Sequence, residues 1–260
     1  MEEKPKSKIK ILLKRIMFAF AIILTSFSLL LFYAYEIEPR RLVVREETLK
    51  IPNWSAKLNN FKIVAISDIH GGSNFVTEEK LRRLAALANA QNPDLIVLLG
   101  DYVSQIHGKE GDLKMPSETV AANLKGFQAK YGVYAVIGNH DWWFNADRIT
   151  RVFQQGGIRV LTNEAVPIER QGQTLWLAGF GDLFSHRDEI EKTLRPVATS
   201  DPILALTHTP DIFLKLPPQV ILTLAGHTHG GQVNLPLLGR RVVPSDYGEK
   251  YAIGYWEEGA

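Results

Sequence analysis

Two histidines one residue apart, His227 and His229, lie between glycines in the stretch LAGHTHGGQ, directly after an apolar run. An imidazole nitrogen can serve as a metal ligand and as an acid or base near neutral pH. On a strand, residues i and i+2 face the same side, so both rings can meet one centre. The alternative is a pair of surface histidines, so the rest of the chain must decide between them.

Polar residues of the same kinds follow four other apolar runs that are typical of buried strands. Together with the run before His227, the predicted strands cover residues 61–67, 94–99, 132–137, 203–207 and 220–225. The carboxyl ends of parallel strands meet at one edge of an α/β sheet, so the residues after them should lie together. These residues are Asp68, His70, Asp101, Asn139, His140, Asp141, His208, His227 and His229.

The residue types indicate which ligand such an edge would bind. The chain contains no cysteine, which excludes disulfides, thiolate metal sites and cysteine nucleophiles. Carboxylate oxygen and imidazole nitrogen without sulfur suit Mn, Fe and Zn. So many such groups exceed the needs of one ion and predict two divalent ions, about 3.5–4 Å apart, sharing a carboxylate and a hydroxide. Each motif alone also fits a turn or a cap, but five in order favour the metal site.

The remaining pattern predicts the fold class. Helices are expected at 77–91, with Thr77 as the N-cap, at 117–130, and from Asn145 to a stop at Gly156. Further strands are expected at 158–162 and 174–180. The alternation of strands with helices predicts an α/β domain with a largely buried sheet.

Charge is unevenly spread along the chain. Residues 1–50 hold 10 Lys/Arg and 6 Asp/Glu, and the remaining 210 residues hold 20 and 22. The body is therefore close to neutral, whereas a general nucleic-acid binder would carry its positive charge there. No nucleic-acid partner is expected.

Residues Ile16 to Tyr35 form an uncharged run of 20 residues, which as a helix would span roughly 30 Å. Six Lys/Arg precede the run and four lie in the 15 residues after it, which favours a cytoplasmic N-terminus and an extracytoplasmic body. A cleaved signal peptide is the alternative, but the run is long for one and no A-x-A-like site follows. We therefore expect a basic cytoplasmic segment (1–15), a single-pass anchor in the cell's inner membrane (16–35), a connector (36–57) and a catalytic domain (58–260).

The ordered motifs D-x-H, G-D, G-N-H-D, a lone H and G-H-x-H, spread over residues 61–251, resemble the signature of the calcineurin-like metallophosphoesterase family. The GHTHGGQV wording and the N-terminal apolar run look most like its envelope-associated bacterial branch. That branch includes phosphodiesterases of the YaeI and YkuE types and the UDP-diacylglucosamine hydrolases of lipid A synthesis.

The resemblance implies a four-layer α/β/β/α sandwich preceded by one transmembrane helix. It also implies two metal ions, with manganese the expected ion in vitro and Fe or Zn as alternatives. His140 would contact the phosphate and assist the leaving group, and Asp141 would orient His140. In the implied ligand sets, Asp68, His70 and His229 hold the first metal, Asn139, His208 and His227 hold the second, and Asp101 bridges them.

The implied function is hydrolysis of phosphodiester or pyrophosphate bonds in a membrane- or envelope-associated, or lipid-linked, substrate by a metal-bridging hydroxide. One alternative is a catalytically silent scaffold, which loss of ligands would mark, yet every motif is present. A nuclease would show basic stripes on the body. A UDP-diacylglucosamine pyrophosphatase would require a cytoplasmic site, against the charge rule.

Three features near the motifs remain open. Trp142 and Trp143, followed by Phe144, either pack in the core or form an aromatic lip that binds substrate. The polar segment 102–115, with His107, either borders the substrate or is a solvated loop. Family relatives continue past the equivalent of YAIGYW while this chain stops at Ala260, so the resemblance implies either a C-terminally shortened domain or final strands that lie outside this sequence.

Overall fold

A computed structural model describes residues 5–52, 54–106, 109–197, 200–235 and 237–258. The first four residues of the expected cytoplasmic segment, His107 and Ala260 lie outside this range. The chain divides into two compact units, Met1–Glu46 and Glu47–Ala260.

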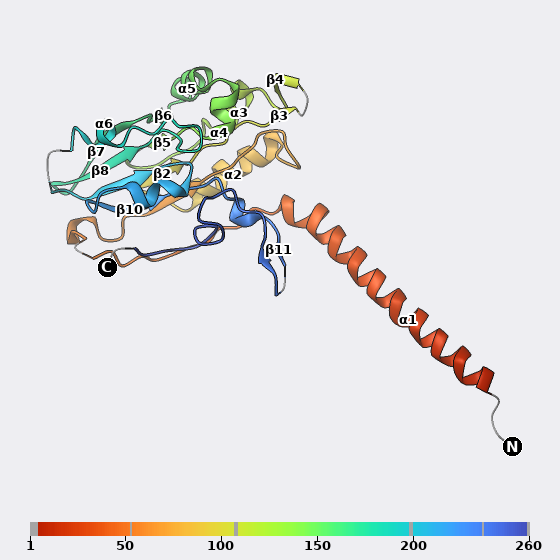
Figure 1. Ribbon diagram of the computed structural model, residues 1–260. Coiled ribbons are helices and arrows are strands. Elements are labelled where there is room, and N and C mark those ends of the chain that lie inside the picture. The colour runs from red at the N-terminus through yellow and green to blue at the C-terminus, as the bar shows by residue number, and fades with distance from the viewer. Residues whose placement is uncertain (1–4, 53, 107–108, 198–199, 236, 259–260) are drawn as a thin grey trace. The chain divides into compact units, whose positions relative to one another are not determined.

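The first unit is dominated by one long helix, α1 (Pro5–Phe32), continued by a π-helical turn (Tyr33–Ile37) and a 3-10 turn (Glu38–Arg40) (Figure 1). The helix is apolar and long enough to cross a membrane, and none of its apolar stretch is buried within the protein. A signal sequence near the N-terminus can pass the same test of length and composition, so α1 is a candidate membrane span by these criteria alone.

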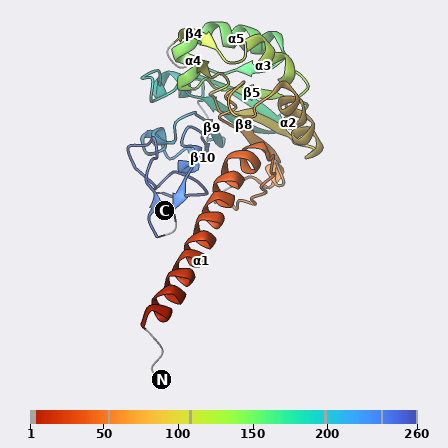
Figure 2. The same ribbon diagram turned by 90° about the vertical axis from the view of Figure 1, so that its right-hand side faces the viewer.

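The second unit contains a fully parallel sheet in the order β1-β2-β5-β6. Helices α2, α3 and α5 lie on one side of this sheet (Figure 2). Thr77 Oγ1 accepts a hydrogen bond from the Lys80 amide at the start of α2, and Asn145 Oδ1 accepts one from the Arg148 amide at the start of α5, so both predicted caps are confirmed. The bounds are β1 (Ile63–Ile66), α2 (Glu78–Ala90), β2 (Leu95–Leu98), α3 (Ser117–Leu124), β5 (Val133–Ala135), α5 (Ala146–Gln155) and β6 (Arg159–Val160).

The second sheet is mixed and has the order β10-β9-β8-β7. Strands β10, β9 and β8 are parallel, whereas β7 pairs with β8 in antiparallel fashion. Gln171 and Gly172 join β7 to β8, and both have positive φ, as a tight hairpin turn requires. The bounds are β7 (Glu164–Arg170), β8 (Gln173–Gly179), β9 (Ile203–Leu206) and β10 (Val220–Leu224).

Alternation of side chains along the strands places the two sheets face to face. In β2, Ile96 and Leu98 join the core under helices α2, α3 and α5, whereas Leu95 and Val97 face the other way. Leu95 and Val97 pack with inward side chains of the other sheet, among them Leu177 of β8. A third core lies on the far face of the second sheet, beneath α6 (Ile190–Leu194) and a 3-10 helix (Pro210–Lys215). The predicted α/β class and layered sandwich are confirmed, with a short outer layer on this side.

Short elements fill the connections. A helix, α4, lies between β5 and α5, where sequence patterns predicted no helix. Two small hairpins, β3–β4 and β11–β12, follow strands of the first and the second sheet along the chain. The bounds are β3 (Gln105–Ile106), β4 (Lys109–Leu113), α4 (Asn139–Phe144), β11 (Asn234–Leu235) and β12 (Gly239–Arg240), with 3-10 turns at Ala56–Leu58 and His229–Gly231.

Candidate metal centre

The segments after five strands meet at one edge of the two sheets, as predicted from the positions of the polar residues. The Asp68 amide donates to the Gly100 carbonyl over 3.0 Å, and the His70 amide donates to the Asp101 carbonyl over 2.9 Å. In the second sheet, the Gly226 amide donates to the His208 carbonyl over 2.9 Å. These backbone bonds hold the loops in fixed register, so the side chains converge.

Glycine is needed where these loops pass each other. A Cβ on Gly100, whose φ is +94°, would lie 2.7 Å from the Gly138 amide nitrogen and from His208 Nδ1. A Cβ on Gly226 would collide with Ser67 Oγ. Both glycines allow backbone segments from different strands to approach more closely than any side chain would permit.

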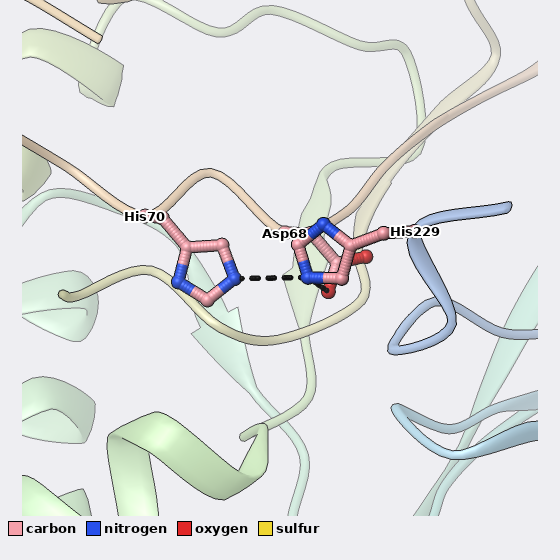
Figure 3. Close-up of side chains that lie close together, drawn as sticks. All are labelled: Asp68, His70 and His229. Carbon is pink, nitrogen blue, oxygen red and sulfur yellow. Dashed lines mark hydrogen bonds and ion pairs between the residues drawn. The ribbon is translucent and has the colours of Figure 1, made fainter. Parts of the chain in front are cut away.

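The first group of converging side chains contains Asp68, His70 and His229 (Figure 3). The Nε2 atoms of His70 and His229 are 3.2 Å apart, and His229 Nε2 is 3.4 Å from Asp68 Oδ1. His70 Nδ1 lies 3.3 Å from the Val103 carbonyl and donates to it, because a carbonyl oxygen only accepts. The unprotonated Nε2 of neutral His70 therefore faces His229 and Asp68.

The second group contains Asp101, His208 and His227, all of them buried. His208 Nε2 lies 3.3 Å from Asp101 Oδ2, 3.2 Å from His227 Nδ1 and 3.0 Å from Asn139 Oδ1. His208 Nδ1 donates to the Leu99 carbonyl over 2.7 Å, which directs Nε2 into the group. Asn139 adds an amide oxygen to this second set.

The Asp101 carboxylate belongs to the second group and also faces the first. Its Oδ2 is 3.3 Å from His208 Nε2 and 3.6 Å from His70 Nε2, so one oxygen faces both sets. Its Oδ1 accepts the backbone N–H of His140 over 2.9 Å. The same side chain can therefore serve a cation in either group.

Helix α4 and the Asp101 loop hold each other in place. The His140 amide donates to the Asp101 side chain, and the Asp101 amide donates to the Asp141 side chain. This reciprocal pair requires the close approach that Gly138 permits, since a Cβ there would collide with Asp101 Oδ1. His140 and the carboxylate between the two groups therefore belong to one rigid unit.

The charges of the site follow from burial and from these contacts. Burial lowers the pKa of His70 and of His227, which favours neutral rings that can bind a cation. Burial also opposes charge on Asp101 and His208, but their mutual contact outweighs it and moves the pKa of Asp101 down to about 2 and that of His208 up to about 9. A metal cation would take the place of the His208 proton, because a metal-bound imidazole is neutral.

The donor set fits divalent metal ions. In each group, imidazole nitrogens and carboxylate or amide oxygens face one another at distances between 3.0 and 3.4 Å. Lone pairs repel unless a proton or a cation lies between them. His227 Nε2 is also buried without a hydrogen-bond partner among the described residues. Oxygen and nitrogen ligands without sulfur are those that Mn, Fe and Zn accept.

Backbone strain is concentrated at the same residues. Positive φ angles between 46° and 70° occur at Asp68, His70, Asp101, His227 and His229. Non-glycine residues adopt this region rarely, at a cost of order 1–3 kcal/mol each, and such residues cluster at functional sites. The fold therefore loses some local stability in directing these side chains into the centre.

His227 and His229 do not face one centre, as two residues of a strand can, but lie in different groups, as in the implied ligand sets. β10 ends at Leu224, so neither histidine lies on a strand. His227 joins His208 in the second group, and His229 begins a 3-10 turn that brings it to His70 in the first. The positive φ of both residues turns the chain between them and separates the rings.

His140 lies beside the first group, with its ring centroid 4.9 Å from that of His70. His140 Nδ1 donates to Gln105 Oε1 over 2.7 Å, and Gln105 Nε2 donates back to the His140 carbonyl over 2.8 Å. Sequence patterns placed Gln105 only within a polar segment of undetermined role. The signal for it was its position in the loop directly after Asp101.

The structure corrects the expectation that Asp141 orients His140. Asp141 stands in the first turn of α4, so its carboxylate faces back toward the backbone of the neighbouring loop. Its oxygens accept the amides of Asp101 over 2.8 Å, Tyr102 over 2.9 Å and Gly138 over 3.0 Å. Burial and the charge of Asp101 raise the pKa of Asp141 to about 7. Asp141 therefore fixes the Asp101 loop, and Gln105 holds His140.

The aromatic residues after the GNHD motif separate into two roles. Trp142 and Phe144 both pack against the helix-side core. The Arg187 guanidinium lies over the ring of Trp142. Trp143 is 58% exposed, and its ring centroid is 4.9 Å from that of His140.

A second exposed ring, Phe184, lies next to Trp143. Its ring centroid is 6.1 Å from that of Trp143 and 5.1 Å from that of His227. Trp143 and Phe184 thus form an aromatic rim beside both groups.

Comparison with known proteins identifies the family. The family model of the calcineurin-like phosphoesterases matches residues 61–231, which include every residue of both groups. The chain belongs to the calcineurin-like phosphoesterase family.

Three relatives are similar to this chain over most of its length. It is 30% identical over 231 residues to the "uncharacterized metallophosphoesterase YkuE" of Bacillus subtilis, covering 88% of this chain and 78% of that protein. It is 31% identical over 202 residues to the phosphodiesterase YaeI of Escherichia coli, covering 75% and 69%. It is 30% identical over 210 residues to the zebrafish (Danio rerio) "transmembrane protein with metallophosphoesterase domain", covering 75% of this chain but 45% of that protein. The resemblance seen in the motifs is confirmed.

As a calcineurin-like phosphoesterase, the protein is a hydrolase of phosphoester bonds, and its family binds divalent metals. The two His/Asp groups could each hold such an ion, as could a third set of neighbouring ligand atoms on His70, Asp101 and His140. α1 could anchor the protein to a membrane, as the name of the zebrafish relative states for that protein.

We expect Gln105→Ala to lower kcat for phosphodiester hydrolysis by roughly tenfold, because a lost hydrogen bond of about 1.4 kcal/mol no longer fixes the His140 ring. KM and metal content should stay unchanged, since the side chain of Gln105 bonds to His140 and not to the candidate ligands. Steady-state kinetics with metal analysis measures this, and nitrogen NMR of the histidine rings should show the change at His140. Gln155→Ala, at the exposed end of α5, is the matched control, and an unchanged kcat in Gln105→Ala would contradict the assignment.

Proposed function

We propose that the protein is a phosphohydrolase dependent on two metal ions that cleaves phosphodiester or pyrophosphate bonds, with a membrane- or envelope-associated substrate. The observation that carries the proposal is the pair of facing donor groups with the Asp101 carboxylate between them. Membership of the family supports the reaction class, and the phosphodiesterase name of YaeI supports the preference for diesters.

In this proposal each group holds one ion. Asp68, His70 and His229 hold the first, Asn139, His208 and His227 hold the second, and Asp101 belongs to both. Manganese is the ion proposed for activity in vitro, with Fe and Zn as alternatives that the same ligands accept. When bound, the two ions would lower the pKa of a water molecule and neutralise charge on the phosphoryl oxygens.

The protein's own residues would do the remaining work. Gln105 accepts from His140 Nδ1, so that in the imidazolium form of His140 the proton on Nε2 can pass to the departing oxygen and leave the ring neutral with its Nδ1–H still bonded to Gln105. Asp141 binds the amides of the 101–103 loop and so keeps Asp101 in place. This division makes His140 and Asp141 the proposed catalytic and positioning residues, respectively, beside the ligands.

Hydrolysis of bis-p-nitrophenyl phosphate by the purified full chain, with Mn²⁺ or with a chelator, tests the proposal. We expect His227→Ala to lose both bound metal and turnover, because it removes a ligand. His140→Ala should keep its metal while kcat falls roughly 10²–10⁴-fold, the usual contribution of a general acid. Metal-loaded, folded wild-type protein without turnover would overturn the function, and metal loss in His140→Ala would overturn the division of roles.

We also propose that the aromatic rim binds the organic group of the substrate. Trp143 lies beside His140 and Phe184, which supports substrate binding by this tryptophan. Trp142 packs in the helix-side core, which favours a structural role for it. Aromatic stacking contributes about 0.5–1.5 kcal/mol, so Trp143→Ala should raise KM for an aromatic diester roughly fivefold with little change in kcat. Trp143→Phe should restore most of the affinity. Equal KM values in all three proteins would refute the rim.

We propose that α1 anchors the protein in the cell membrane with the catalytic unit on the extracytoplasmic side. The excess of Lys/Arg before the apolar run supports this orientation. Full-chain fusions at the C-terminus should be active with alkaline phosphatase and dark with green fluorescent protein in a bacterial host. The reverse pattern would put the site in the cytoplasm and favour a nucleotide-linked lipid pyrophosphate as substrate.

A further inference from the structure

The hairpin β11–β12 follows directly after the turn that holds His229. Asn234 pairs with Arg240, and Leu235 pairs with Gly239, in antiparallel register. The pair extends away from the two sheets in both views (Figure 1, Figure 2). Its sequence, QVNLPLLGRRVV over residues 232–243, is mostly apolar and holds two arginines but no acidic residue.

Large apolar side chains of this hairpin are in contact with solvent. Leu237 is fully exposed, Val242 is 79% exposed, and Val233 and Leu238 are more than half exposed. Single exposed apolar residues are ordinary, but a group of four on one projecting hairpin indicates an interaction surface. Such a surface is stabilised when another apolar phase covers it.

The arginines indicate what that phase is. Arg241 is exposed, and Arg240 follows the apolar residues of the tip within β12. An apolar tip with arginines behind it is the arrangement of a segment that enters the boundary of a bilayer, with its cations at the level of the headgroups. Each arginine near an anionic surface contributes about 1 kcal/mol.

The chain itself favours a bilayer over a second protein. It carries the candidate membrane span α1, and residues 41–46 join the last turn after α1 to the second unit, which begins at Glu47. A fully extended connection of this length spans at most roughly 20 Å. A tether of that reach keeps a membrane surface at high effective concentration around the catalytic unit, so even weak insertion would be populated.

We propose that the β11–β12 hairpin inserts its apolar tip into an anionic lipid surface and thereby sets the metal centre beside it. Arg240 Nε donates to the Gly230 carbonyl over 2.7 Å, so the hairpin is bonded to the residue next to His229. Gly231 makes room for this contact, because a Cβ there would lie 2.9 Å from the Arg240 side chain. Resting on the proposed phosphohydrolase function, this inference specifies a lipid-linked phosphodiester or pyrophosphate, hydrolysed at the bilayer surface, as the substrate class.

The absence of cysteine allows a clean test. The full-chain variant Leu237→Cys is labelled at its one cysteine with an environment-sensitive fluorophore. The variant Gln155→Cys, at an exposed position of α5, is labelled in the same way as a control. Each protein is placed as one copy in nanodiscs of phosphatidylcholine, alone or with phosphatidylglycerol in equal parts. We expect blue-shifted emission and strong quenching by lipid-borne nitroxides only for the label at 237, and most in the anionic discs.

Second substitutions in the Leu237→Cys variant separate the contribution of the apolar side chains to membrane insertion from that of the arginine charge. Leu238→Glu should abolish the quenching, whereas Leu214→Glu, at an exposed leucine outside the hairpin, should not change it. Arg241→Gln should lower the ratio of inserted to free hairpin about fivefold in anionic discs and leave it unchanged in phosphatidylcholine. A label at 237 that stays water-like in all discs would overturn the proposal.

Turnover distinguishes this proposal from the function on which it rests. Leu238→Glu should hydrolyse the water-soluble bis-p-nitrophenyl phosphate at the wild-type rate, because the substitution is outside the metal centre. Normal turnover of the soluble diester without quenching at 237 would reject the hairpin and retain the phosphohydrolase. Quenching at 237 without any turnover would retain the hairpin and reject the phosphohydrolase.

Discussion

Compensation of the buried Asp101 charge holds the centre together. The pKa of about 2 means that this buried carboxylate carries a negative charge. A buried charge is costly unless positive partners and hydrogen bonds compensate it. His208 and His70 face one oxygen, and the His140 amide binds the other. Metal cations would complete this compensation, which couples the binding of metal to the integrity of the fold.

The two sheets each contribute part of the donor set, so their alignment is a condition for function. The first supplies four donors from the segments after β1, β2 and β5, and the second supplies three after β9 and β10. Between the sheets, Leu95 and Val97 of β2 pack with Leu177 of β8 and with Leu204 and Leu206 of β9. Loss of this packing would separate the donors, because close-packed cores transmit displacement rather than absorb it.

Much of the fold could be predicted, because short apolar runs such as 94–99 and the caps Thr77 and Asn145 are local signals. Helix α4 could not, since its first turn is bonded through Asp141 to a loop 40 residues away. β7 was missed because its exposed glutamates and its proline weaken the strand pattern. These failures share a cause, which is that the deciding contact comes from a distant segment or from an edge position.

Residue types and their positions after apolar runs are local properties, and they were enough to predict the fold class, the family and the residues that the structure brings together. The grouping of those residues emerged only on folding. In the folded chain, His227 and His229 lie in different groups, His140 is hydrogen-bonded to Gln105, and the Asp141 carboxylate binds backbone amides. Those outcomes depend on left-handed turns and on contacts between distant loops, which no local pattern encodes.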